Sequence, residues 1–172
     1  MIDAGGFIGI IQKYTEIYNC YSKASVEAEA SIRGSCSVAG FISKCEQNTE
    51  IFNCYATGNV NAFCSSQESK GTARAAGFVS SPHFSKTEIE NCFSIGDTVT
   101  NTTGSGHAYS FSMRGTNCYY NSEQESVCCS EGNSSATPAP LNDLKKAKFY
   151  TDVLGWDGSI WEFKDGAFPT LK

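Results

Sequence analysis

The sequence has few charges, few prolines and almost no histidine. Only 18% of its 172 residues are charged, four are proline, and the net charge is −5. No basic stripe is present, so binding to the phosphate backbone of nucleic acids is not expected. No apolar run is long enough for a membrane helix, so membrane insertion is not expected either. The two histidines, His83 and His107, form no His-Glu-x-x-His motif, which excludes that metallopeptidase chemistry.

The residues that are abundant suit a protein of short strands and many turns. Glycine occurs 16 times, and 11 Phe and 8 Tyr provide apolar surface to bury. The length fits one domain. Only the stretch near residues 140–150 has a strongly helical pattern.

One block, Thr-Glu-Ile-x-Asn-Cys, recurs along the chain. Full copies lie at 15–20, 49–54 and 87–92, and a shortened copy, Thr-Asn-Cys, lies at 116–118. A Gly-Phe block precedes the Asn of each full copy, its Phe 12 or 13 residues upstream, and a Val follows it. One unit therefore reads as strand, turn, strand, turn, strand and a loop of variable length, and the loops are expected at 27–38, 61–75 and 100–108.

A unit of three short strands cannot bury its own apolar residues, so the units must stack. The sequence predicts an all-β fold, a parallel, right-handed β-helix or solenoid of three to four coils, with strands about 4.8 Å apart. The expected units are residues 4–38, 39–75, 76–109 and a degenerate 110–136, followed by a capping segment, 137–172. The predicted columns are Phe7/Phe41/Phe78, Ile17/Ile51/Ile89, Asn19/Asn53/Asn91/Asn117, Cys20/Cys54/Cys92/Cys118 and Val26/Val60/Val99.

The Asn column fits a corner of the coil, and two geometries are open there. Strict alternation would send Ile17 and Cys20 to opposite faces, whereas a bend at Asn19 would let both point inward. The bend is favoured, because Cys is small and commonly buried. Glu90 of the third copy occupies the position that Tyr18 has in the first copy. Because a Glu would not replace an aromatic residue in the core, this column is expected to face solvent.

These blocks resemble the GLUG-motif repeats of bacterial surface proteins, which include adhesins and the non-catalytic regions of IgA-specific metallopeptidases. The clearest copy runs from Gly40 to Val60. The resemblance implies a β-solenoid on a bacterial cell-surface protein, with no defined ligand. The chain departs from the pattern at Ser43 and Ser80, which replace the second Gly of the first block, and the fourth unit lacks its Gly-Phe block.

The start of the chain and its C-terminal segment each add a prediction to the repeat pattern. Repeat sequence follows Met1 at once, with no signal peptide, so we expect the chain to begin within an array of a longer protein. In the cap, Leu141–Tyr150 is expected to form an amphipathic helix. The aromatic residues that follow are expected to plug the last coil, and a sugar-binding platform is the less favoured alternative. These aromatic residues are Trp156, Trp161, Phe163 and Phe168.

The candidate binding face is one exposed column and the aromatic residues beside it. Stacked carboxylates could also share a divalent cation or serve a glycosidase, but solvated charges are the favoured interpretation. No catalytic, metal or cofactor-binding residue is assigned. The candidate residues of this face are Tyr14, Tyr18, Phe52, Glu16, Glu50 and Glu88.

The nine cysteines do not read as a simple disulfide framework. The four column cysteines are expected to be reduced, since parallel neighbours point the same way and bond poorly. Cys36, Cys45 and Cys64 lie outside the column, and a Cys36–Cys64 disulfide is one possibility. Cys128 and Cys129 are adjacent, which is poor spacing for two zinc ligands.

The sequence favours a non-enzymatic surface or interaction module, a structural spacer or adhesin-like segment, located extracellularly or at the cell surface. Its expected partners are a host or cell-wall protein or a glycan. The alternative is a carbohydrate-binding or carbohydrate-processing β-helix. A third possibility is a structural array that self-associates through the open end of the solenoid.

Overall fold

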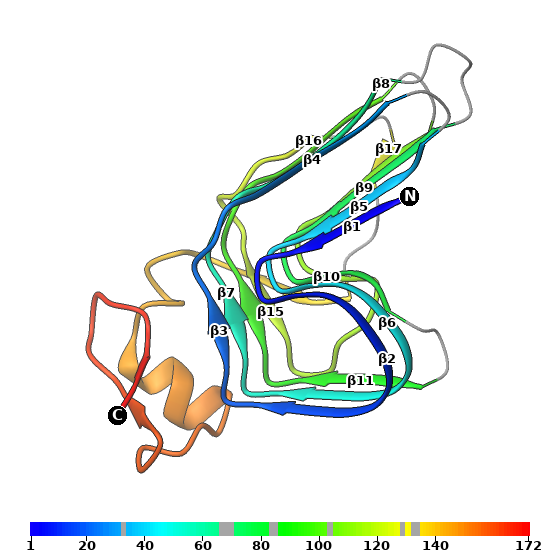
Figure 1. Ribbon diagram of the computed structural model, residues 1–172. Coiled ribbons are helices and arrows are strands. Elements are labelled where there is room, and N and C mark those ends of the chain that lie inside the picture. Colours follow the sequence, from blue (N-terminus) through cyan, green and yellow to red (C-terminus); the bar gives the residue numbers. More distant parts are fainter. Residues whose placement is uncertain (32–33, 66–70, 83–85, 103–104, 128–129, 132–134) are drawn as a thin grey trace.

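The fold is a parallel β-solenoid with a C-terminal segment lying against its side (Figure 1). A computed structural model describes residues 1–172 except 32–33, 66–70, 83–85, 103–104, 128–129 and 132–134. Every strand pair described in the solenoid is parallel, and each strand pairs with its counterpart in a neighbouring coil. The predicted all-β solenoid of several coils is confirmed.

The coils build four sheets, named A to D in chain order. Sheet A contains β1 (Ile2–Gly5), β5 (Cys36–Ala39), β9 (Thr72–Ala76), β14 (Ser105–Tyr109) and β17 (Ser130–Glu131). Sheet B contains β2 (Ile8–Tyr18), β6 (Ile42–Phe52), β10 (Val79–Ser81) and β11 (Thr87–Glu90). Sheet C contains β3 (Tyr21–Ser22), β7 (Tyr55–Ala56), β12 (Phe93–Ser94), β15 (Tyr119–Asn121) and β18 (Thr137–Ala139). Sheet D contains β4 (Val26–Ser31), β8 (Val60–Ser65), β13 (Thr98–Thr102) and β16 (Ser126–Val127).

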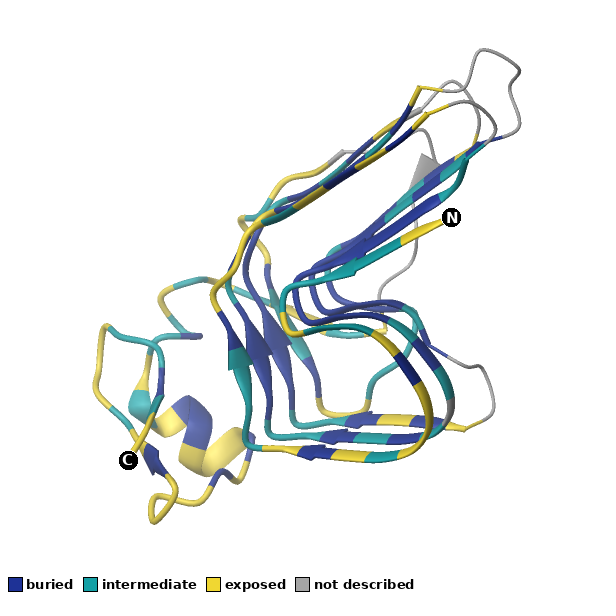
Figure 2. Ribbon diagram, in the orientation of Figure 1, coloured by how far each residue is buried: buried dark blue, intermediate teal, exposed yellow. Residues whose placement is uncertain are grey.

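The predicted loops at 27–38, 61–75 and 100–108 are wrong for most of their length. Sheets D and A run through these segments and lie face to face as a thin lobe (Figures 1 and 2). Small apolar residues fill the lobe, and β4 shows the pattern most plainly, since its Val-Glu-Ala-Glu-Ala alternates small apolar residues with exposed Glu. The buried residues of the lobe are Ala28, Ala30, Cys36, Val38, Val60, Ala62, Cys64, Ala73 and Ala75.

The Asn column forms a left-handed backbone corner in every coil. The four φ angles are 56° at Asn19, 55° at Asn53, 53° at Asn91 and 49° at Asn117. Asn tolerates this region better than other residues that carry a Cβ. The reversal lets the Ile and Cys on either side of the corner both point inward, as the bend interpretation expects, and Ile51 and Cys54 are fully buried.

The cysteines beside these corners bond to the neighbouring coil. The backbone N–H of Cys20 donates to Cys54 Sγ at 3.3 Å, and that of Cys54 donates to Cys92 Sγ at 3.4 Å. The Cys54 thiol in turn lies 3.1 Å from the carbonyl oxygen of Phe52, in its own coil. The sulfurs of Cys54 and Cys92 therefore each satisfy a corner amide of the preceding coil.

The Phe column continues into the fourth coil, where the sequence predicted its loss. Phe41, Phe78 and Phe111 are fully buried, and neighbouring rings stack 4.8 Å apart. A Cβ on Gly40 would lie 2.3 Å from the carbonyl oxygen of Gly77, so this corner requires glycine wherever another coil follows closely. Ser110 replaces the glycine in the fourth coil, and the Phe position is kept.

The predicted Val column is wrong in its third member. Val26 and Val60 are in register, but Thr98, not Val99, pairs with Val60. Thr98 is fully buried, and its hydroxyl hydrogen-bonds the Ser126 hydroxyl at 3.1 Å. The Gly-Asn-Val of coil 2 therefore corresponds to the Gly-Asp-Thr of coil 3, and Val99 lies one residue beyond the column.

The C-terminal segment covers the outer face of sheet C instead of plugging the last coil. Trp161 Nε1 donates to Asn19 Oδ1 in the first coil at 3.2 Å, and Trp156 Nε1 donates to the Asn91 carbonyl in the third at 3.0 Å. The reason is an outward aromatic column on sheet C that needs burial. The column residues are Tyr21, Tyr55, Phe93 and Tyr119.

The predicted helix Leu141–Tyr150 is shifted toward the C-terminus. Turns occupy 141–145, and the helical segment is short and ends in the π-helix η1 (Phe149–Val153), which buries Phe149 and Tyr150. A short antiparallel pair, β19 (Trp161–Glu162) and β20 (Thr170–Leu171), completes the segment. The hydroxyl of Tyr55 donates to the Pro169 carbonyl at 2.6 Å, which ties this end of the segment to coil 2.

We expect Phe41→Ala to lower the free energy of unfolding by about 3–5 kcal/mol, because it opens a cavity inside the aromatic stack. The matched variant is Phe7→Ala at the end of the same column, where the ring is 45% exposed. Its loss should be much smaller, since exposed apolar surface contributes less. Urea unfolding followed by tryptophan fluorescence measures both, and equal losses would contradict the ladder.

A second pair of variants tests the corner. Asn53→Ala should destabilise the protein by about 1–2 kcal/mol, the cost of a left-handed conformation for an ordinary L-residue. Asn53→Gly should lose less, because glycine adopts positive φ readily. If urea unfolding showed the glycine variant to be as unstable as the alanine variant, the corner would not depend on backbone conformation.

Candidate binding face

The outer face of sheet B carries the side chains that the sequence predicted as a binding face. Strands β2, β6 and β11 are in register, with Thr15, Thr49 and Thr87 in one column. Thr49 and Thr87 point inward and are buried, so the adjacent residues point outward. This second column is Glu16, Glu50 and Glu88, as predicted.

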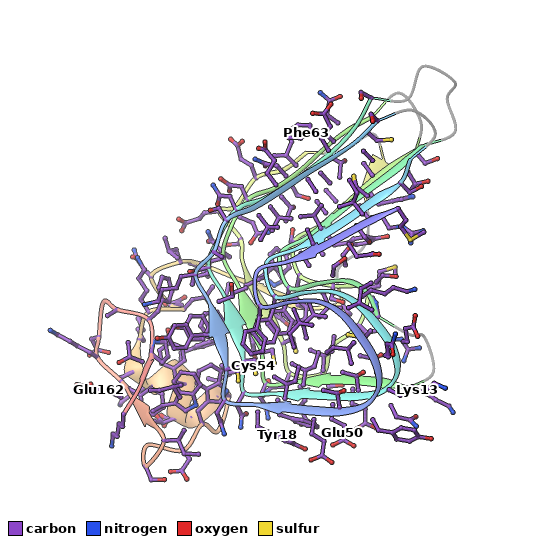
Figure 3. All side chains as sticks on the ribbon, in the orientation of Figure 1. Lys13, Tyr18, Glu50, Cys54, Phe63 and Glu162 are labelled. Atoms are coloured by element: carbon purple, nitrogen blue, oxygen red, sulfur yellow. The ribbon has the colours of Figure 1, made fainter. Side chains whose placement is uncertain are left out.

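An aromatic pair lies beside the carboxylates. The rings of Tyr18 and Phe52 stack with their centroids 5.3 Å apart and 9° between their planes. The Tyr18 hydroxyl donates to Glu50 Oε2 at 3.0 Å, which links coils 1 and 2 across the face. This hydrogen bond to the Glu50 carboxylate raises the pKa of Tyr18 above its ordinary value. Figure 3 shows Tyr18 and Glu50 together on the outside of this sheet.

Tyr14 lies at a second bend, some distance along the strand. Its φ is 48° and it is 78% exposed, and Asn48 has the same φ at the matching position of coil 2. The long strands β2 and β6 turn here, as Figure 1 shows. The six predicted residues therefore share one sheet, but Tyr14 stands at its bend and not in the columns of Tyr18 or Glu16.

Two hollows on this side bring basic residues to the acidic column, and the sequence did not indicate either. A hollow of about 250 Å³ is lined by Asn48, Thr49, Glu50, Lys86 and Glu88. A second, of about 540 Å³, brings Arg114 and Met113 near Glu88 and Glu90. Lys86 directly precedes Thr87, at the repeat position of Tyr14 and Asn48, whereas Arg114 lies in the connection before the shortened copy.

Neighbouring side chains reduce the electrostatic repulsion within the acidic column. Stacked carboxylates at strand spacing repel each other mildly, and the Tyr18 hydroxyl and nearby cations offset part of that repulsion. In the described ranges, no three His, Cys, Asp or Glu side chains form a group that could hold a metal ion. His83 lies outside the described residues.

The first coil exposes apolar side chains at the open end of the solenoid. Phe7 is 45% exposed, Ile10 47% and Ile2 39%. Phe7 and Ile2 end columns whose next members, Phe41 and Cys36, are buried, whereas Ile10 is in register with the partly exposed Lys44. Self-association through this end stays a prediction.

The described cysteines divide into the column at the corners, a pair in the lobe, and Cys45 in β6 within the main core. All seven described cysteines carry free thiols: Cys20, Cys36, Cys45, Cys54, Cys64, Cys92 and Cys118. Burial raises the pKa of Cys45 to about 12, and burial also raises that of Cys92. Cys128 and Cys129 lie outside the described residues.

We expect Cys45 and Cys92 to resist iodoacetamide in the folded protein at about pH 8, close to the ordinary thiol pKa. The thiolate is the reacting form, and a raised pKa together with burial keeps both thiols neutral and covered. Mass spectrometry should find both alkylated once urea is added. Labelling of the native protein at the denatured rate would contradict this burial.

Comparison of the chain with protein-family models, with curated proteins and with solved structures gave no match. The likeness to GLUG repeats therefore rests on the repeated blocks themselves and stays a prediction. Among the described residues no helix is long and apolar enough to cross a bilayer.

Proposed function

We propose that the chain is a non-enzymatic surface or interaction module of a longer bacterial protein, a structural spacer or adhesin-like repeat segment outside the cell. The observation that carries the proposal is that the C-terminal segment binds along the side of the solenoid and contacts three successive coils. One C-terminal segment bonds to Asn19 in the first coil, Tyr55 in the second and Asn91 in the third. A solenoid tied along its side resists separation of its coils, which suits a stiff spacer.

The open sheet faces support the interaction part of the proposal. Sheet B leaves Tyr18 44% exposed beside acidic side chains, on a surface that spans several coils. Flat faces of this kind suit contact with an extended protein or glycan of a host or a cell wall. The exposed Glu residues favour a neutral or cationic partner over an acidic one.

Carbohydrate binding or processing is the second candidate, and the Tyr18–Phe52 stack favours its binding form. An aromatic face offers apolar surface to a sugar ring, and the Glu50 carboxylate can accept hydroxyl hydrogen bonds. The cap does not supply the platform considered from the sequence. Trp156 is 3% exposed and Trp161 1%, so both indoles are core residues.

A single panel experiment tests the proposal. The full chain is immobilised and exposed to neutral, acidic and amino-sugar polysaccharides and to purified bacterial wall material. Biolayer interferometry measures binding, and an assay for new reducing ends measures cleavage. We expect no release of reducing ends, since the proposal assigns no catalytic groups. Release of new reducing ends by the wild-type chain would overturn the non-enzymatic assignment.

Two variants locate any binding that is found. Tyr18→Ala removes the exposed ring, and we expect it to weaken binding at sheet B by at least tenfold, the loss of about 1.4 kcal/mol. The matched control is Ile160→Ala, which removes an exposed apolar side chain from the C-terminal segment. If both variants bind like the wild type, the sheet B face is not the contact. If nothing on the panel binds, the carbohydrate candidate fails and the spacer role remains.

A further inference from the structure

Coil 2 places two thiols opposite each other in the lobe between sheets A and D. Cys36 begins β5 and Cys64 lies near the end of β8, and each is 2% exposed. The neighbouring coils do not repeat this arrangement. The register neighbours of Cys36 are Ile2 and Ala73, and those of Cys64 are Ala30 and Thr102. The pair therefore does not arise from the repeat.

Two hydrogen bonds hold each thiol against the chain segment that carries the other thiol. Cys36 Sγ donates to the carbonyl oxygen of Phe63 at 3.1 Å, the residue directly before Cys64. Cys64 Sγ donates to the carbonyl oxygen of Gly34 at 3.0 Å, two residues before Cys36. The two bonds fix both side chains in the space between the sheets.

The lobe is thin enough for a covalent link. Its interior consists mainly of alanine and valine, and Cα atoms of β5 and β8 approach within 8 Å of each other. A disulfide needs Cα atoms about 4.4–6.8 Å apart. Cα atoms of β5 and β8 within 8 Å of each other leave only a small approach for the link to form.

We propose that Cys36 and Cys64 form a disulfide in an oxidising environment and thereby staple sheet A to sheet D. Both residues also border a surface hollow, so little of the lobe separates them from solvent. The hollow at Cys36 has a volume of about 280 Å³, and the one at Cys64 about 430 Å³. The link closes the chain between residues 36 and 64 into a loop, which restricts the unfolded state.

The oxidation balances with a small-molecule disulfide such as oxidised glutathione. One protein thiolate attacks the glutathione disulfide and releases one reduced glutathione, which leaves a mixed disulfide. The second protein thiolate attacks the protein sulfur of that mixed disulfide and releases the other glutathione. The protein loses two electrons, and its two thiol protons end on the two released glutathione thiols.

The test is a disulfide map of the full chain equilibrated with oxidised glutathione. After an acid quench, free thiols are alkylated in urea, the chain is digested without reduction, and linked peptides are identified by mass spectrometry. We expect a Cys36–Cys64 peptide, with Cys45, Cys54 and Cys92 recovered in alkylated form. Recovery of Cys36 and Cys64 as alkylated residues, as separate glutathione adducts or in bonds to other cysteines would overturn the proposal.

Stability supplies a second readout that does not depend on variants. The oxidised chain should unfold at a higher urea concentration than the reduced chain, and equal midpoints would overturn the stapling role. In matched variants, Cys36→Ser should abolish both the linked peptide and the shift, whereas Cys45→Ser should keep both. Because the primary result is read on the wild type, poor folding of a variant leaves the test intact.

Discussion

The left-handed corner at the Asn-Cys pair is the constraint on which the rest of the structure depends. Because every coil reverses its backbone at the same place, strands on both sides of the corner stay in register through the stack. Asn supplies the conformation, and the Cys that follows is small enough to turn inward. Its sulfur also accepts an amide hydrogen bond from the adjoining coil. The corner thus joins local conformation to long-range stacking.

The same corner explains where the C-terminal segment binds. The residue after each Cys points outward and is aromatic in all four coils, which produces an apolar strip along sheet C. The segment that covers this strip leaves Tyr55 and Phe93 fully buried. Pro138 lies in β18, the edge strand of sheet C in the last coil. Because proline has no backbone N–H, it weakens pairing of this edge with a further strand.

The repeat carried most of what could be predicted. A recurring Ile-x-Asn-Cys block implies stacked copies whatever the number of strands, so the registers of Ile17, Asn53 and Cys92 followed from spacing alone. The lobe was missed because its strands are built from Ala, Ser and Glu, which have weak strand preferences. Its alternation of small and polar residues, visible in β4, was the available signal.

Other features depend on geometry that no single copy encodes. Thr98 takes the inner position because a hydroxyl can be buried when Ser126 pairs with it, and this partner comes from the next coil. The side-on position of the cap required knowing that Tyr55 and its column face outward. On the candidate face, the Glu column followed from the repeat. Lys86 stands beside it at a repeat position that holds Tyr14 and Asn48 in the earlier coils, and Arg114 reaches it from the connection before the shortened copy.

The central claim is that the interior of each coil is completed by the coils above and below it. Solution NMR of the isotopically labelled chain tests this directly through contacts between side-chain methyl and aromatic protons. The account predicts cross-peaks linking Ile51 to both Ile17 and Ile89, and Tyr55 to both Tyr21 and Phe93, in parallel register. Cross-peaks that instead pair consecutive strands such as β2 and β3 as antiparallel hairpins would contradict it.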